Sequence, residues 1–471
     1  MKPPPRGRAD LVELAQEGLS LQRKRAVGIP LRLVTALATL VVIGTLLLLL
    51  PPMTTQPIGF MDALFTATSA AAVTGLTVVT TGVAFTRLGQ WVILFLMQFG
   101  GLGFVVTVVL TLRLLGRQVS LIDRLAVTSS FGLAGPRAVL QILGRTVLVM
   151  LALETIGTLI LWLHWRNSGI VPPDEALFYA LFHSVAAFCN AGFDLFSGLP
   201  MYPDGLPADT ITLLTLGLLI ILGGLGIPVY MDVLHRRSTG DLRRRRLSLH
   251  TRLALWSALA LILVGWVGLL AAEYRHGGVL TDLSFGERTL RAWFQSVAAR
   301  TAGFAGLTDF GEISEASRLL LTGLMFIGSA PASMGGGITT GTLAVLVAAT
   351  WNLNRGHKSV RVGDRAISMA TVWRATTVLI VSLVVVFVAT WLLLISQAQD
   401  FSSTLFEVVS AYSTTGLSVG LTSQLNPFGR LVIIAMMFWG RLGAITIMLV
   451  LLRRSGRETL VGYPEETVLV G

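Results

Sequence analysis

The sequence contains little charge and almost no cysteine. Only 13% of its 471 residues are charged, whereas 53% are hydrophobic. A water-soluble chain carries about a quarter charged residues, so this composition excludes an ordinary soluble enzyme. The single cysteine, Cys189, excludes a disulfide framework, an iron–sulfur cluster and a cysteine-based zinc site. The apolar residues stand in long blocks, and blocks of about 20 residues span a bilayer. The sequence therefore predicts an integral membrane protein.

The positive charge is unevenly distributed along the chain. Of the 36 Lys and Arg residues, 27 lie in five segments, and the outer segments between them hold 8 basic and 14 acidic residues. Because cytoplasmic loops carry the excess of Lys and Arg, we expect both termini and the basic segments on the cytoplasmic side of the membrane. Solvated loops or anchors to anionic lipid account for most of these residues, so nucleic acid is not needed as a partner. The basic segments are 2–32, 113–145, 236–252, 355–374 and 453–457.

Long apolar spans predict eight transmembrane helices. The first apolar block, 33–50, lacks a small-residue cleavage site, so we interpret it as a retained helix and not as a signal peptide. The spans lie near 31–51, 88–112, 141–165, 210–233, 251–273, 318–350, 372–396 and 428–452.

Four similar segments lie between the outer ends of consecutive spans, and each is too short and polar to cross the membrane. Each contains a short apolar stretch followed by a small or hydroxyl residue pair and a glycine. The glycines recur at spacings of 117, 111 and 113 residues, which indicates one unit used four times. The segments are Val73-Thr74-Gly75, Asn190-Ala191-Gly192, Thr301-Ala302-Gly303 and Thr414-Thr415-Gly416.

A second series of glycines confirms this register. It lies at the centre of the later span of each unit, at Gly100, Gly223, Gly328 and Gly440. Small residues let membrane helices approach closely, which explains this second series. It does not explain the first series, because those glycines lie in re-entrant segments.

Each unit therefore reads as a helix, a half-membrane helix, an extended loop and a second helix. Parallel repeats of this kind surround an axis along the membrane normal. The predicted fold is an all-α integral membrane protein with four tandem helix–pore-helix–helix repeats around a pseudo-fourfold central pore. We expect an N-terminal segment 1–30, repeats at 31–112, 141–234, 251–351 and 372–452, and a C-terminal tail 453–471.

The four glycine-ended segments, called here the filter loops, are suited to binding a monovalent cation. Irregular backbone is tolerated at membrane depth only where protein buries it or water lines it. Glycine allows its carbonyl to face the axis, and a ring of carbonyls can replace the hydration shell of K⁺. No ring of carboxylates for Mg²⁺ or Ca²⁺ accompanies them. Half-helices near 60–72, 176–188, 288–299 and 403–413 would point their negative ends at the axis, and Asp194 with the other outer acids would attract cations.

These motifs resemble the Trk/Ktr/HKT superfamily of potassium transporters, and more narrowly its KtrB-type membrane subunit. The resemblance covers about 31–471, through the four units, the segments 188–193 and 300–304, and the C-terminal Tyr463-Pro464-Glu465-Glu466. It implies a potassium uptake subunit with eight spans. In the family, glycine in the first filter loop marks potassium-selective members and serine marks sodium-selective ones, so Gly75 implies potassium.

The third unit departs from the others after its central glycine. Residues 328–341 contain Pro331 and five glycines, so they cannot form a regular helix and must break the sixth span. A phosphate-binding role fails because the lysine of a P-loop is missing. The resemblance implies that this segment, called here the gating loop, obstructs the pore. Its candidate gate residues are Gly328, Ser329, Gly335, Gly336 and Gly337.

Arg441 stands in the fourth unit where its siblings have Gly101 and Gly224. A charge at this depth is costly and is a functional candidate by default. We expect Arg441 to hold the gating loop through backbone carbonyls, as the resemblance implies. The alternative is that it packs against a carboxylate such as Glu154.

Three other functions are alternatives. A sodium or unselective cation pathway would use the same loops. An enzyme is disfavoured because His183 and Ser184 are adjacent on a helix and point about 100° apart. A structural scaffold would not need four polar re-entrant loops.

A pore that stayed open would dissipate the membrane potential, so we expect partners that control it. The resemblance implies a homodimer, with the tail ending at Gly471 at the dimer contact, and a soluble KtrA/TrkA-like ring of Rossmann-fold subunits that bind nucleotide. The transported ion is K⁺, with Na⁺ as a coupling or activating ion left open. No organic cofactor is expected in this chain.

Overall fold

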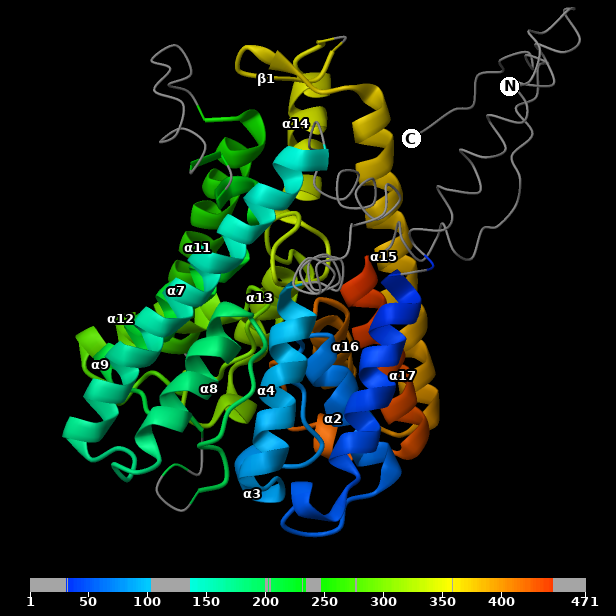
Figure 1. Cartoon of the computed structure of the whole chain (residues 1–471). Coiled ribbons are helices and arrows are strands. Elements are labelled where there is room, and N and C mark those ends of the chain that lie inside the picture. The colour runs from blue at the N-terminus through cyan, green and yellow to red at the C-terminus, as the bar shows by residue number, and fades with distance from the viewer. Residues whose placement is uncertain are drawn as a thin grey trace, which may run out of the picture.

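In the part of the chain that the computed structural model describes, the regular secondary structure is helical apart from one short hairpin (Figure 1). The structure describes residues 31, 33–102, 136–199, 202, 205–230, 232–233, 247–275, 278–357 and 359–443. The expected N-terminal segment, the C-terminal tail and most of two basic segments lie outside these residues. Each predicted span contains helix, although the predicted ends at 103–112 and 444–452 also lie outside.

The longer helices fall into two groups. The outer ones are Leu33–Leu48, α4 (Arg87–Leu102), α7 (Pro136–Ser168), α9 (Thr210–Gly224), α11 (Leu249–Arg275), α13 (Glu315–Phe326), α14 (Thr340–Asn354), α15 (Met369–Ser396) and α17 (Pro427–Leu442). The inner ones are α2 (Phe60–Ala71), α8 (Ala176–Phe188), α12 (Phe285–Ala298) and α16 (Phe401–Tyr412), which coincide with the predicted half-membrane helices.

Side-chain caps set where these helices begin. Ser284 and Glu287 form a reciprocal capping box at the start of α12. The Asp400 carboxylate accepts from the Ser403 N–H at 2.9 Å at the start of α16. That backbone hydrogen bond holds the pKa of Asp400 below its usual range, because it stabilises the charged carboxylate.

The inner helices are arranged in a ring. Each inner helix packs on the later outer helix of the preceding unit: α8 on α4, α12 on α9 and α16 on α13. The ring closes because α2 packs on α17. The four units therefore follow one another around a common axis in chain order.

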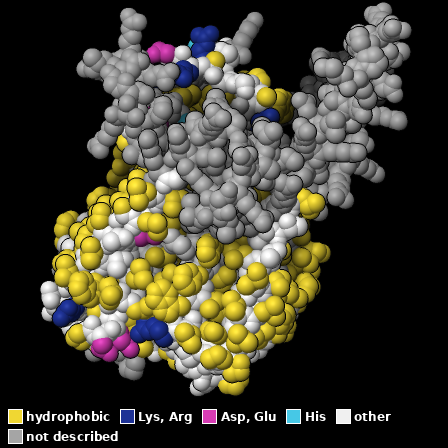
Figure 2. Space-filling model, in the orientation of Figure 1, with side chains coloured by type: hydrophobic (Ala, Val, Ile, Leu, Met, Phe, Trp, Pro, Cys, Tyr) yellow, Lys and Arg dark blue, Asp and Glu magenta, His cyan; other side chains and the backbone are white. Residues whose placement is uncertain are grey.

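The outside of this ring is apolar. Figure 2 shows hydrophobic side chains covering the middle of the visible face, with charged groups near its lower edge and at the top. Among the described residues, three helices are long and apolar enough to span a membrane: 147–168, 249–274 and 369–396. Side chains such as Leu148, Phe387 and Val267 are more than half exposed on them, as expected of a surface that faces lipid.

Two features concern the ends of helices. The sixth span is broken as predicted, because α13 ends at Phe326 and α14 begins at Thr340. The antiparallel hairpin of β1 (Arg361–Val362) and β2 (Arg365–Ala366) was not predicted. It joins α14 to α15 at the top of Figure 1, within the basic segment 355–374.

Candidate functional site

The four filter loops meet in a closed ring. A Cβ atom placed on Gly75 would collide with the carbonyl oxygen of Ala191 in the next loop. The same relation links each remaining glycine to the following loop: Gly192 to Ala302, Gly303 to Thr415, and Gly416 back to Thr74. The ring therefore requires glycine at all four positions, since a side chain at any of them would run into neighbouring backbone.

The loops share one unusual backbone conformation. The first residue of each loop has a positive φ, at 57° for Val73 and Asn190, 72° for Thr301 and 51° for Thr414. Each glycine also has a positive φ, between 67° and 96°. Four loops of different sequence thus take the same strained path, and such strain is typical of functional sites.

The backbone N–H groups of the loops are bound behind the ring. Thr74 N donates to Ser69 O and Thr415 N to Ser410 O, both at 2.8 Å. Gly75 N and Gly416 N donate to the hydroxyls of the same two serines at 3.0 and 3.1 Å. The inner helices therefore hold the N–H side of these two loops.

The inner helices direct their C-terminal ends at the ring. Each ends four or five residues before its glycine. The partial negative charge of a helix C-terminus attracts cations, so the four ends favour a cation at the ring.

A cavity of about 200 Å³, called here the vestibule, lies against one side of the ring. Its lining includes all four glycines together with Thr77, Asp194 and Ser418. The carboxylate of Asp194 is already bound by the Phe196 and Ser197 N–H groups at 2.9 and 2.8 Å. Asp194 therefore supplies charge near the vestibule, while its oxygens are engaged by the protein.

The gating loop lies against the opposite side of the ring. Gly336 N donates to Thr414 Oγ1 at 2.9 Å, and a Cβ on Gly335 would meet the Thr301 hydroxyl. Gly328 abuts Gly336, and Ser329 is 2% exposed. Gly337 has a φ of 73°. The predicted gate residues are thus brought together with two filter loops.

The second unit also holds the gating loop. Ala330 N donates to Gly224 O, and Ile227 N donates to Ala332 O, both at 3.0 Å. Gly100, Gly223 and Gly440 lie directly against the last residues of inner helices, so close packing on these helices explains three members of the second glycine series.

Arg441, in the fourth unit, contacts both the third and the first unit. Its guanidinium donates to the carbonyl oxygens of Met334, Gly100 and Gly101, the last at 3.1 Å. It thus joins α17 to the gating loop and to the end of α4. The contact with backbone carbonyls agrees with the expectation from the sequence, although the contact with α4 was not foreseen.

Glu154 has partners other than Arg441 in the described part of the chain. Its carboxylate accepts from Gln98 Nε2 at 3.1 and 3.3 Å, and it is 4% exposed. Cys189 Sγ approaches Gln98 Oε1 at 3.6 Å. Sequence reasoning missed Gln98, whose only signal was a polar amide inside an apolar span.

His183 and Ser184 do not form a nucleophile–base pair. His183 Nε2 contacts Asp194 Oδ1 at 2.9 Å, whereas Ser184 Oγ donates to Glu154 O at 2.7 Å. His183 thus faces the segment that follows the second filter loop and Ser184 faces α7, as their adjacency on α8 predicted.

Comparisons with known proteins show similarity to cation transport proteins. The profile of the TrkH family, described as cation transport protein, matches residues 19–457. Ktr system potassium uptake protein B of Bacillus subtilis (strain 168) is 36% identical over 437 residues, which are 92% of this chain and 94% of that protein. Potassium/sodium uptake protein NtpJ of Enterococcus hirae is 34% identical over 424 residues, covering 88% and 90%.

One solved structure shares the fold. The potassium transporter TrkH from Vibrio parahaemolyticus superimposes with a TM-score of 0.70 at 21% sequence identity, over 91% of this chain and 84% of that one.

Proposed function

Because the chain belongs to the TrkH family of cation transport proteins, we propose that it is the ion-translocating subunit of a potassium uptake system. The members of this family are cation transporters and not enzymes, which decides against the enzymatic alternative. The observation that carries the proposal is the closed ring of four glycines, each pressed against the backbone of the next loop.

The ring selects the ion through backbone carbonyls. Carbonyl oxygens of the four filter loops replace the water around K⁺, and inner-helix ends together with the charge of Asp194 raise the cation concentration there. The name of the Bacillus subtilis relative, Ktr system potassium uptake protein B at 36% identity, supports potassium as the ion. The residues of this site are the twelve residues 73–75, 190–192, 301–303 and 414–416.

Sodium is the second candidate ion. It is favoured by one observation, the printed name of the Enterococcus hirae relative as a potassium/sodium uptake protein. Sodium is either transported through the same ring or acts as a coupling ion, and ion competition separates these two cases.

The gate is the loop 328–341, held by Arg441. Its position against Thr301 and Thr414 supports this role, because a loop there obstructs the path from the ring. Four repeats in a bacterial plasma membrane, with cytoplasmic termini, complete the proposed architecture. A homodimer and a nucleotide-binding regulatory ring, docked on basic loops such as 355–374, are the proposed partners.

Growth at low potassium tests the function. A bacterial strain without its own uptake systems would express the chain, with and without a regulatory ring subunit of a Ktr system. We expect rescue that requires the ring subunit. If protein reaches the membrane and no pairing rescues growth, potassium uptake is wrong and sodium flux becomes the measurement that decides.

A further inference from the structure

The fourth filter loop is clipped to its inner helix by a buried carboxylate. Glu407, on α16, is 0% exposed. Its Oε1 accepts from Ser418 Oγ at 2.5 Å and from Val419 N at 3.2 Å, and its Oε2 accepts from Thr422 Oγ1 at 2.7 Å. The segment that leaves Gly416 is therefore tied back to the helix that leads into the loop.

In two other units, a different polar side chain at nearly the same position of the inner helix contacts the segment after the filter glycine. Such a contact is called here a clip. In the third unit Gln295 Oε1 accepts from Gly306 N at 2.9 Å. In the second unit His183, also 0% exposed, contacts Asp194 at 2.9 Å and Leu195 N at 3.3 Å. In the first unit this position is Thr66, whose buried hydroxyl has no partner among the described residues.

Glu407 forms the clip with the largest number of donors. An uncompensated carboxylate would be costly at this depth, so its three donors, one an obligatory backbone N–H, must remain in place. They fix residues 418–422 relative to α16. Because Ser410 on the same helix binds Gly416 N at 3.1 Å, the loop is held from both sides of its glycine.

We propose that Glu407 is a positioning residue for ion discrimination, which keeps the Gly416 loop at the radius of the glycine ring. This inference rests on the proposed function. It assigns Glu407 a role in choosing K⁺ over Na⁺ without contact with the ion, because small displacements of one loop change the fit of the carbonyl ring.

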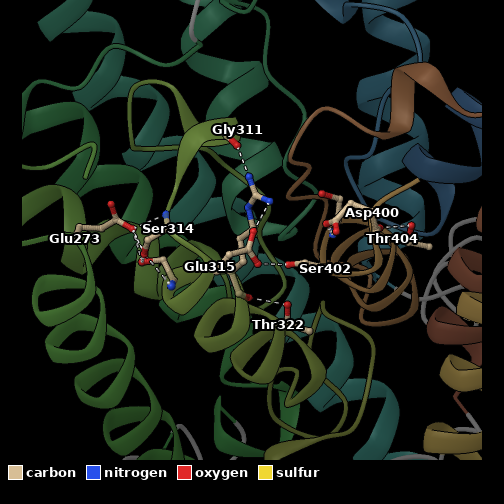
Figure 3. A network of polar contacts seen from close by, with 11 residues as sticks. Glu273, Gly311, Ser314, Glu315, Thr322, Asp400, Ser402 and Thr404 are labelled. Atoms are coloured by element: carbon tan, nitrogen blue, oxygen red, sulfur yellow. Dashed lines mark hydrogen bonds and ion pairs between the residues drawn. The ribbon is translucent and has the colours of Figure 1, made fainter. Parts of the chain in front are cut away.

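A matched control exists in the same chain. Glu273, on α11, is also 0% exposed. It accepts from Ser314 N at 3.0 Å, Ser317 Oγ at 2.5 Å and Val279 N at 3.2 Å. Figure 3 shows this network: Glu273 and Ser314 lie on one side of Glu315, and Ser402 and Asp400 lie on the other. The partners of Glu273 named here lie eleven or more residues along the chain from a filter glycine, against two to six for the partners of Glu407. Glu273 therefore reports the cost of losing a buried carboxylate that does not hold the residues next to a filter glycine.

The experiment uses the purified full-length chain in liposomes together with a regulatory ring subunit of a Ktr system, and it measures the ratio of K⁺ to Na⁺ flux and the thermal unfolding midpoint. Glu407→Ala should lower the flux ratio about tenfold, as expected for the loss of a buried hydrogen bond to a charged group. Glu407→Gln should keep the flux ratio within about twofold of that of the native chain. Its amide oxygen can accept from Val419 N, as that of Gln295 accepts from Gly306 N. Glu273→Ala should lower the unfolding midpoint and leave the ratio unchanged.

Three outcomes are distinguishable. An unchanged ratio in folded Glu407→Ala, or an equal fall in Glu273→Ala, overturns the positioning role. A native chain that does not prefer K⁺ overturns the proposed function itself. If Glu407→Ala does not fold, Thr422→Val removes one donor without changing α16, and a native flux ratio in that variant overturns the inference.

Discussion

Gly336 N of the gating loop donates a 2.9 Å hydrogen bond to Oγ1 of Thr414, the first residue of the fourth filter loop. The approach is close, since a Cβ on Gly336 would lie 2.7 Å from that oxygen and 2.9 Å from Gly440 O. The gate and the filter therefore touch directly, and a hydroxyl of the filter stabilises the position of the gating loop.

Removing this hydroxyl should loosen the gate. Thr414→Val is compatible with the loop, because Val73 occupies the matching position in the first unit at φ 57°. Loss of one buried hydrogen bond should raise K⁺ flux without a regulatory partner about fivefold. Flux into liposomes measures this change. Thr340→Val is the matched control, since that buried hydroxyl has no partner in the described chain. Equal basal flux in native and Thr414→Val protein would contradict the coupling.

Arg441 should act on the same gate through its three carbonyl contacts. Arg441→Ala removes the link between Met334, Gly100 and Gly101, so basal K⁺ flux should rise by more than in Thr414→Val. Arg441→Lys keeps the charge but lacks the fork of donors, and should give an intermediate flux. Flux in liposomes with and without the regulatory ring checks this. The gate role of Arg441 is wrong if the three proteins leak equally.

The glycine register and the inner helices were predictable from the sequence, for physical reasons. Glycine is required wherever φ is positive and backbone lies against backbone, as at Gly75 and Gly303. The inner helix predicted near 60–72 is found at Phe60–Ala71. The break in the sixth span was equally predictable, because proline and clustered glycines exclude a continuous helix.

The contacts between units were not predictable. Gly336 and Thr414 are 78 residues apart, and nothing in a single sequence pairs them. The donors to Glu407 are two hydroxyls and one backbone N–H of a loop whose path is set by tertiary packing. The hairpin at Arg361–Val362 and Arg365–Ala366 was missed because two-residue strands are too short to show alternation.

The first filter glycine offers a test of selectivity. Gly75 has a φ of 92°, and a Cβ there would strike Ala191 O. Gly75→Ser should therefore displace the second loop and lower the K⁺ to Na⁺ flux ratio about tenfold or more, since strain and collision together exceed ~1.4 kcal/mol. Gly169→Ser is the control, with a φ of 71° and open space around it. A native flux ratio in Gly75→Ser would argue against a carbonyl ring that needs four glycines.

The closure of the ring between its first and last units depends partly on one ion pair. Arg430 Nη1 lies 2.6 Å from Asp62 Oδ1, joining α17 to the first turn of α2, and both side chains are 23% exposed. A double-mutant cycle of Asp62→Asn and Arg430→Gln, read as the free energy of unfolding in detergent, should give a coupling of about 1 kcal/mol. The Arg318–Glu315 pair, within one helix and with Glu315 68% exposed, should give a smaller coupling. Because Asp62 and Arg430 join different units, substituting them should also change the K⁺ to Na⁺ ratio. Equal couplings for the two pairs would show that this contact does not hold the ring closed.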